Sequence, residues 1–178
     1  MGKASDLRRE LKARFLPSLA ARGFAIDMRD APTFARCRRG VGDSVEILEV
    51  QWDKYGRPRF VINFGTCPVE GIQVGVERFA VESVSVGWLS VSGRLQPRRG
   101  SSTSAWFSQE KPLLHRLFSS SRLRSPESVV QDLLDLFPEV EAYWAHGTIG
   151  RHLTLFRTPR PDEAGRPTRV SGPLRQGE

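Results

Sequence analysis

The sequence is short of cysteine and histidine and has no long apolar run. Its two cysteines, Cys37 and Cys67, are too few for the disulfide framework of a small secreted domain. Neither has a second cysteine or a histidine at zinc-ligand spacing, so we expect two small, partly buried hydrophobic residues and no metal or cofactor site. No apolar run approaches the ~18 residues of a membrane span. The N-terminus also lacks the apolar stretch of a secretory signal. Together these features predict a cytoplasmic protein without a membrane partner.

Lysine is scarce as well, and arginine takes its place. The chain has four lysines and 23 arginines, with a formal net charge of +7. An arginine excess suits phosphate or carboxylate recognition, because the guanidinium offers a bidentate fork. It is equally explained by a genome rich in G and C. The arginines are spread along the chain, so the charge favours an anionic partner without locating a binding surface.

Two segments have the periodicity of amphipathic helices. Near the N-terminus, Ser5 is a good N-cap, and Leu7, Leu11 and Phe15 form one apolar stripe. Pro17 is expected to kink or restart this helix. A second helix is expected to begin after Ser125, with proline at its first position, and to end at proline 138; a short helix is also expected at 112–118.

Period-two alternation predicts strands, all but the last of them between the two helices. Two alternating runs around the polar turn 53–56 predict an antiparallel hairpin. The strand candidates are residues 24–28, 33–38, 48–52, 59–65, 72–76, 84–95, 106–107 and 153–156. We therefore expect an α+β fold in a single domain, residues 1–157, with a curved antiparallel sheet of about five or six strands. The N-terminal and C-terminal helices pack on one face of this sheet. Residues 158–178, rich in proline and arginine, are expected to be a disordered tail.

The order of these elements resembles a bacterial family, domain of unknown function 4304. The resemblance spans roughly residues 5–145 and rests on short segments: Gly23-Phe24, residues 45–52, Phe60-Val61-Ile62-Asn63-Phe64-Gly65, Trp88 with Arg94-Leu95, Trp106-Phe107, and the terminal helix. It implies a helix, an antiparallel sheet and a C-terminal helix, and no assigned activity.

Three residues make the sharpest candidate for a ligand or partner surface. If residues 84–95 form one strand, Trp88 and Arg94 point to the same face, and Trp106 lies across from them on the next strand. An arginine beside indole rings binds anionic or planar ligands. The alternative is that the tryptophans belong to the core and that Arg94 extends along the margin of the sheet.

Other polar groups give weaker signals. His146 and His152 lie near Glu139 and Glu141, but a spacing of six matches no helical metal-ligand pair. Basic doublets at 38–39, 98–99 and 122/124 lack interleaved aromatic residues, so solvated loops are the better interpretation. No nucleotide-binding or hydrolase motif is present, and no catalytic residue is predicted.

Three functions remain open at this level. The favoured one is a non-catalytic binding protein that recognises an anionic or protein partner. The second is nucleic-acid binding through dispersed arginines and the basic tail. The third is an enzyme of unrecognised type with a site near Arg94 and Trp88.

Overall fold

The computed structural model describes residues 3–28, 33–98, 105–110 and 123–157. The helix expected at 112–118 and the tail expected at 158–178 lie outside these residues and stay predictions. Within the described ranges, no helix combines the length and the apolarity that crossing a bilayer requires.

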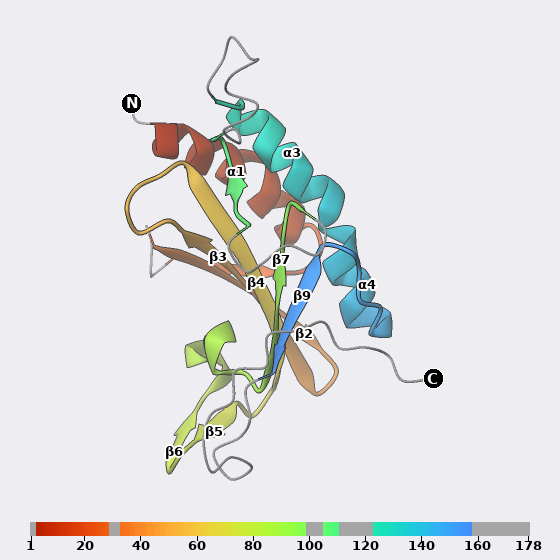
Figure 1. The fold of residues 1–178 in the computed structure, drawn as a ribbon. Helices are drawn as coiled ribbons and strands as arrows, with labels where there is room; N and C mark the ends of the chain where they lie inside the picture. The colour runs from red at the N-terminus through yellow and green to blue at the C-terminus, as the bar shows by residue number, and fades with distance from the viewer. Residues whose placement is uncertain (1–2, 29–32, 99–104, 111–122, 158–178) are drawn as a thin grey trace.

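An antiparallel sheet of seven strands forms the body of the protein (Figure 1). Its order is β1-β2-β3-β4-β7-β9, and β8 pairs with the start of β4. The strands are β1 (Ala25–Asp27), β2 (Phe34–Val41), β3 (Ser44–Trp52), β4 (Arg59–Pro68), β7 (Val91–Leu95), β8 (Phe107–Ser108) and β9 (Leu153–Arg157). A separate two-stranded sheet, β5 (Ile72–Val74) and β6 (Glu77–Phe79), extends from one end. The α+β class and the β3–β4 hairpin are confirmed, and the sheet has one strand more than the upper expectation.

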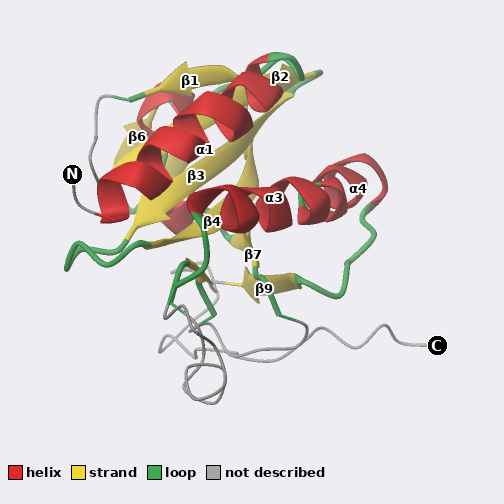
Figure 2. Cartoon of the chain, turned by 90° about the horizontal axis from the view of Figure 1, so that it is seen from above, coloured by secondary structure: helices red, strands yellow, loops and turns green. Residues whose placement is uncertain are grey.

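Three helices cover one face of the large sheet (Figure 2). They are α1 (Lys3–Ala20), α3 (Pro126–Leu136) and α4 (Pro138–His146). The expected start of α3 is confirmed, since the Ser125 side chain accepts a hydrogen bond from the backbone N–H of Ser128 at 3.2 Å. A restart at Pro17 is not seen, because α1 runs through this residue as one helix. Buried side chains on both sides of Pro17, such as Phe15 and Leu19, hold the helix against the sheet and offset the missing backbone donor.

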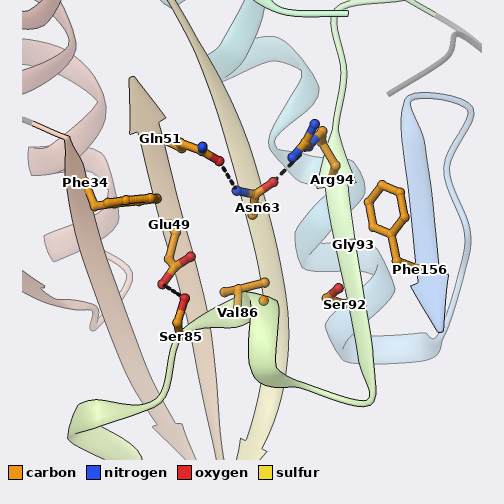
Figure 3. Close-up of a pocket in the computed structure, with 11 residues that line it drawn as sticks. Phe34, Glu49, Gln51, Asn63, Ser85, Val86, Ser92, Gly93, Arg94 and Phe156 are labelled. Atoms are coloured by element: carbon orange, nitrogen blue, oxygen red, sulfur yellow. Dashed lines mark hydrogen bonds between the residues drawn. The ribbon is translucent and has the colours of Figure 1, made fainter. Parts of the chain in front are cut away.

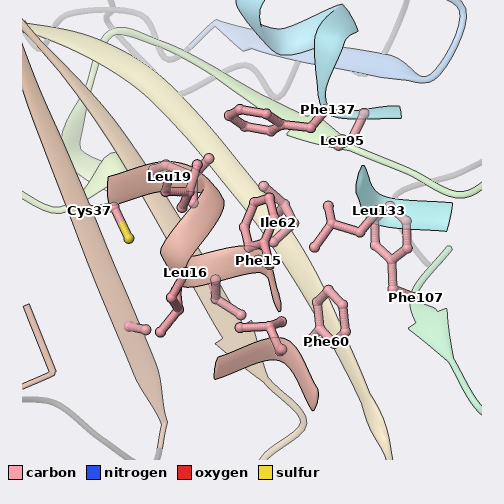
Figure 4. Packing of buried hydrophobic residues seen from close by; sticks show 14 of the residues in the cluster. Phe15, Leu16, Leu19, Cys37, Phe60, Ile62, Leu95, Phe107, Leu133 and Phe137 are labelled. Atoms are coloured by element: carbon pink, nitrogen blue, oxygen red, sulfur yellow. The ribbon is translucent and has the colours of Figure 1, made fainter. Parts of the chain in front are cut away.

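The main core lies between these helices and the sheet (Figure 4). Alternation along β4 directs Phe60, Ile62 and Phe64 to this face, and each is fully buried. Phe15 of α1 meets Phe137, at the α3–α4 junction, edge-to-face with ring centroids 5.4 Å apart. Burial of one such side chain contributes about 1.5–3 kcal/mol, so this layer is the main source of stability.

A second, smaller core lies on the opposite face of the sheet. The segment 81–89 crosses this face as two short 3-10 helices, Val81–Ser83 and Val86–Trp88. It packs against the sheet through apolar side chains of both partners: Val45, Ile47, Cys67, Val81, Val84, Val86 and Leu89. Gly65 makes room for this contact, because a Cβ atom there would lie 2.5 Å from the Leu89 side chain. The expected continuous strand at 84–95 is therefore wrong. Residues 84–89 instead pack their apolar side chains on the face of the sheet away from the helices, and only residues 91–95 pair as a strand.

The two cysteines lie on opposite faces of the sheet, one in each core. Burial raises the pKa of the Cys37 thiol to about 12 and also raises the pKa of Cys67. Because the thiolate is the reactive form, we expect neither cysteine to react with an aromatic disulfide reagent in the native protein. Both are expected to react once denaturant unfolds the chain. Stoichiometric labelling under native conditions would contradict this packing.

Candidate functional site

A row of polar side chains crosses the sheet on the face away from the helices. Successive backbone partners place one residue from each of six strands, all except β8, in this row: Asp27, Arg36, Glu49, Asn63, Arg94 and Thr154. These residues alternate along their strands with the buried residues of the main core, so all six side chains share one face. The segment 81–89 covers only part of this face.

A cavity of about 260 Å³ lies between this segment and the polar row (Figure 3). Glu49, Gln51, Asn63 and Arg94 contribute polar atoms, Phe34 is on β2, and Phe156 is on the edge strand β9. The remaining lining residues are Ser85, Val86, Gly87, Ser92 and Gly93. Residues from five strands thus meet at one site, although they are far apart in the sequence.

Glu49 is the buried carboxylate of the site, with 2% of its surface exposed. Its Oε1 atom receives the Nε–H of Arg36 at 2.9 Å and the hydroxyl of Ser85 at 3.0 Å. The ion pair compensates the buried charge, and the hydroxyl contact attaches the segment 81–89 to the sheet. Both interactions use Glu49 as a structural acceptor.

Asn63 connects the two sides of the cavity. Its Nδ2 donates to Oε1 of Gln51 at 3.2 Å, and its Oδ1 accepts from Nε of Arg94 at 2.8 Å. The single amide therefore fixes the positions of a neighbouring amide and of a guanidinium. Burial lowers the pKa of Arg94, but an arginine guanidinium stays protonated in a protein, so this side chain keeps its charge.

The three residues singled out from the sequence do not form one cluster. Arg94 lines the cavity. Trp88 belongs to the second 3-10 helix, is 49% exposed, and packs on Phe79 with ring centroids 4.9 Å apart. Trp106 instead stacks with Arg59, whose guanidinium carbon lies 4.7 Å from the ring centroid. The shared face proposed for Trp88 and Arg94 is corrected, because the two residues are not on one strand.

The sequence pattern did not single out Glu49, Gln51 and Asn63 as site residues. Alternation places Glu49 and Gln51 on the face of β3 away from the core, and this pattern was the only signal available. Which residues of β2, β4 and β7 lie beside them depends on strand order and register, which a single sequence does not give.

Three of the doublet arginines, Arg38, Arg39 and Arg124, take part in internal ion pairs. Arg38 lies 4.0 Å from Asp27 and donates to the carbonyls of Val81 and Val84. Arg39 pairs with two glutamates, and Arg124 lies 2.7 Å from Asp132. Arg99 and Arg122 lie outside the described residues. Arg38, Arg39 and Arg124 therefore stabilise the fold, whereas Arg98 is exposed.

The histidine candidates are also separated. His152 Nδ1 lies 2.6 Å from Glu139 Oε1, and the His152 backbone N–H donates to Oε2 of the same carboxylate. This pair ties the start of β9 to α4, whereas His146 is exposed in the last turn of that helix. Among the described residues, no group of three or more acidic, histidine or cysteine side chains is placed to hold a metal ion.

Arg59, beside Trp106, is part of a second buried charge pair that stabilises the β3–β4 turn. Asp53, 5% exposed, receives hydrogen bonds from the Arg59 side chain and from the backbone N–H groups of Tyr55 and Arg57. Burial opposes ionisation of Asp53, but these hydrogen bonds outweigh it and lower the pKa of its carboxyl. Because the pKa of Asp53 is lower in the folded protein than its ordinary value of 3.8, the ionised carboxylate stabilises the fold at pH values above 3.8. This stabilisation is lost as the pH falls through the lowered pKa.

We therefore expect Asp53→Asn to lower the free energy of unfolding by about 1.5–3 kcal/mol at neutral pH. The difference between variant and wild type is expected to shrink as the pH falls through and below 3.8. Urea unfolding curves recorded at neutral pH and below pH 3.8 measure this difference in the free energy of unfolding. A difference independent of pH would show that the charge of Asp53 contributes nothing to the turn.

The fold and the site together define a structural class of protein. It is an α+β protein with helices on one face of an antiparallel sheet and, on the other face, a polar cavity lined by one arginine, Arg94. No family model, no curated protein and no solved structure matches the chain. The resemblance to domain of unknown function 4304 therefore stays a prediction.

Proposed function

We propose that the protein is a non-catalytic binding protein that takes an anionic group into the cavity on the open face of its sheet. The observation that carries the proposal is the Gln51–Asn63–Arg94 chain of hydrogen bonds, which holds a guanidinium and an amide at the cavity surface. A group prepositioned in this way loses little freedom when a ligand binds, which favours binding.

The lining residues support binding over catalysis. Ser85 is the only hydroxyl among them with a carboxylate partner, and that carboxylate is itself paired with Arg36. The described lining thus offers no free base next to a nucleophile. Nucleic-acid binding receives less support, because Arg38, Arg39 and Arg124 of the expected doublets take part in internal ion pairs. The proposal includes the cytoplasmic location that the sequence favours.

A thermal-shift screen tests this function. We expect anionic compounds, and not neutral or cationic ones, to raise the melting temperature of the wild-type protein, because a ligand that binds only the folded state stabilises it. The shift is expected to disappear in Arg94→Gln and to persist in Arg57→Gln. Arg57 is the matched control, because its side chain is exposed in the β3–β4 turn and lies outside the cavity lining. Equal shifts in both variants, or no shift with any anion, would refute the proposal. A shift with short DNA or RNA that survives Arg94→Gln would favour the nucleic-acid alternative.

A further inference from the structure

Exposed apolar side chains gather at the end of the protein where the β5–β6 hairpin extends from the body (Figure 1). Val76, in the turn of this hairpin, is 98% exposed, and Val74 on β5 is 44% exposed. Trp88 is 49% exposed, and its ring contacts that of Phe79 on β6, with centroids 4.9 Å apart. We call Val74, Val76, Glu77, Phe79 and Trp88 the hairpin surface. Grouped apolar residues left to water indicate an interaction site, whereas single ones do not.

The hairpin presents this surface in a fixed orientation. The register pairs Ile72 with Phe79 and Val74 with Glu77, so these four side chains share one face of the hairpin. Ile72 and Phe79 pack against the smaller core, and the same face continues into solvent at Val74 and Glu77. The base of the hairpin packs tightly, because a Cβ atom at Gly71 would collide with the carbonyl oxygen of Phe79. A partner therefore meets a preformed apolar face.

The charge around the hairpin surface is negative. Four exposed carboxylates lie on the hairpin or near its base: Asp43, Glu70, Glu77 and Glu82. The backbone carbonyl of Asp43 accepts from the N–H of Val69 at 3.1 Å, which places the β2–β3 turn next to the start of the hairpin. Within the ranges that the structure describes, none of the four takes part in an ion pair. Arg78 is the only cation on β5 or β6, and the register places it on the opposite face, across from Gln73. This end is thus locally acidic in a chain of net charge +7.

The negative charge limits the partners that the hairpin surface can take. It repels nucleic acid and anionic lipid surfaces, which carry charge of the same sign. It also opposes a symmetric dimer through this surface, because a two-fold axis would bring the same carboxylates together. A complementary partner carries cationic and apolar side chains on one segment.

The C-terminal part of this chain contains such a segment. Residues 166–175 include three arginines, the apolar residues Val170 and Leu174, and no acidic residue. The chain leaves the sheet at Arg157, whose partner on β7 is Val91, three residues after Trp88. At ~3.3–3.6 Å per residue, the stretch from 157 to 166 spans up to roughly 30 Å. The segment therefore reaches the hairpin surface from the end of β9.

From these observations we infer that residues 166–175 dock on the hairpin surface of the same chain. Their arginines lie beside the carboxylates, and Val170 and Leu174 lie against Trp88 and the two valines. A tethered segment has an effective concentration on the order of millimolar, so weak contacts suffice to hold it. The inference goes beyond the proposed function and does not depend on it, because no residue of the hairpin surface lines the cavity.

Paramagnetic relaxation in the full chain tests the docking. A nitroxide on Ser171→Cys lies inside the segment, and the two native cysteines are buried. We expect the nitroxide to remove most of the ¹H–¹⁵N signal intensity of residues 74–77 and of the Trp88 indole. The indole signals of Trp52 and Trp144, which belong to the main core on the other face of the sheet, are expected to keep their intensity. Reducing the nitroxide is expected to restore the lost signals.

Variants test why the segment docks. Glu77→Lys is expected to restore most of the lost intensity, because it replaces an attraction by a repulsion. Asp135→Lys is the matched control and is expected to restore none, since Asp135 is exposed on α3, which covers the opposite face of the sheet. Val76→Ser, at a side chain that is 98% exposed, is expected to restore part of the intensity while the protein stays folded. Salt at about 1 M is expected to act like Glu77→Lys, because it screens exposed charges.

Three results would overturn the inference. Full intensity at residues 74–77, or an equal loss at Trp52, would show that the segment does not prefer this surface. A loss that survives both Glu77→Lys and high salt would show that charge does not guide the contact. If a chain without nitroxide loses the same signals when it is mixed with the labelled chain, the occupant is the segment of a second copy. The thermal-shift screen with Arg94→Gln decides the proposed function separately.

Discussion

Replacing Arg39 by methionine is expected to lower the free energy of unfolding by about 3–5 kcal/mol, the cost of leaving a buried charge without its partner. Arg39 Nη2 lies 2.6 Å from Oε2 of Glu46 and 2.8 Å from Oε2 of Glu141. Glu46 is 7% exposed, so it cannot recover its hydration when the guanidinium is removed. Urea unfolding followed by far-UV circular dichroism measures the effect.

Arg39 has a large effect because it connects three parts of the fold. It joins β2 to β3 through Glu46 and to α4 through Glu141, and it donates to the carbonyl of Arg22 at the end of α1. Its guanidinium carbon also lies 4.4 Å from the ring centroid of Phe24. Loss of this side chain removes charge pairing and packing together.

A double variant separates these contributions. Arg39→Met combined with Glu46→Leu removes both members of the buried pair, and we expect it to regain most of the lost stability. Arg9→Met is the control: its pair with Asp6 is exposed, so a change within about 1 kcal/mol is expected. If Arg39→Met were no more destabilising than Arg9→Met, the pair with Glu46 would not stabilise the fold.

Gly93→Val is expected to destabilise the protein by about 1–3 kcal/mol or more, the range for overpacking a core. A Cβ atom at Gly93 would lie 2.3 Å from the Phe64 ring. Phe64 is fully buried and contacts Tyr143 and Trp144 of α4 at centroid distances of 5.5 and 5.8 Å. The ring therefore cannot move aside without displacing the helix.

A second substitution tests whether the Phe64 ring causes the clash at position 93. Combining Gly93→Ala with Phe64→Leu shortens the side chain opposite the new methyl group, so we expect the double variant to be more stable than the sum of the two single changes predicts. Gly87→Ala is the control, because a Cβ atom there meets nothing within 4 Å. Additive effects in the double variant would show that the Phe64 ring is not the obstacle.

Much of the fold follows from local patterns. The apolar stripe of α1, the cap at Ser125 and the alternation in β3 and β4 each arise from residues close together in the chain. Periodicity of this kind reports which face of an element is buried, and the helices and the hairpin were found where it is strong.

The errors have one physical cause. Residues 84–88 look like a strand because Val84 and Val86 alternate, but their apolar side chains are buried against the far face of the sheet instead. Pro17 suggests a kink or a restart of the helix, but no restart occurs, because packing on both sides of Pro17 holds α1 as one helix. In both cases tertiary contacts override the local preference.

By itself, the sequence determined that the protein has helices at both ends of an antiparallel sheet, and it identified Arg94 as a residue of interest. It did so because side-chain periodicity encodes which face of each element is buried. Only the tertiary structure decided that Glu49, Gln51, Asn63 and Arg94 share one cavity. These residues lie on three strands, and their proximity comes from strand order and register, which are set by contacts between residues distant in the chain.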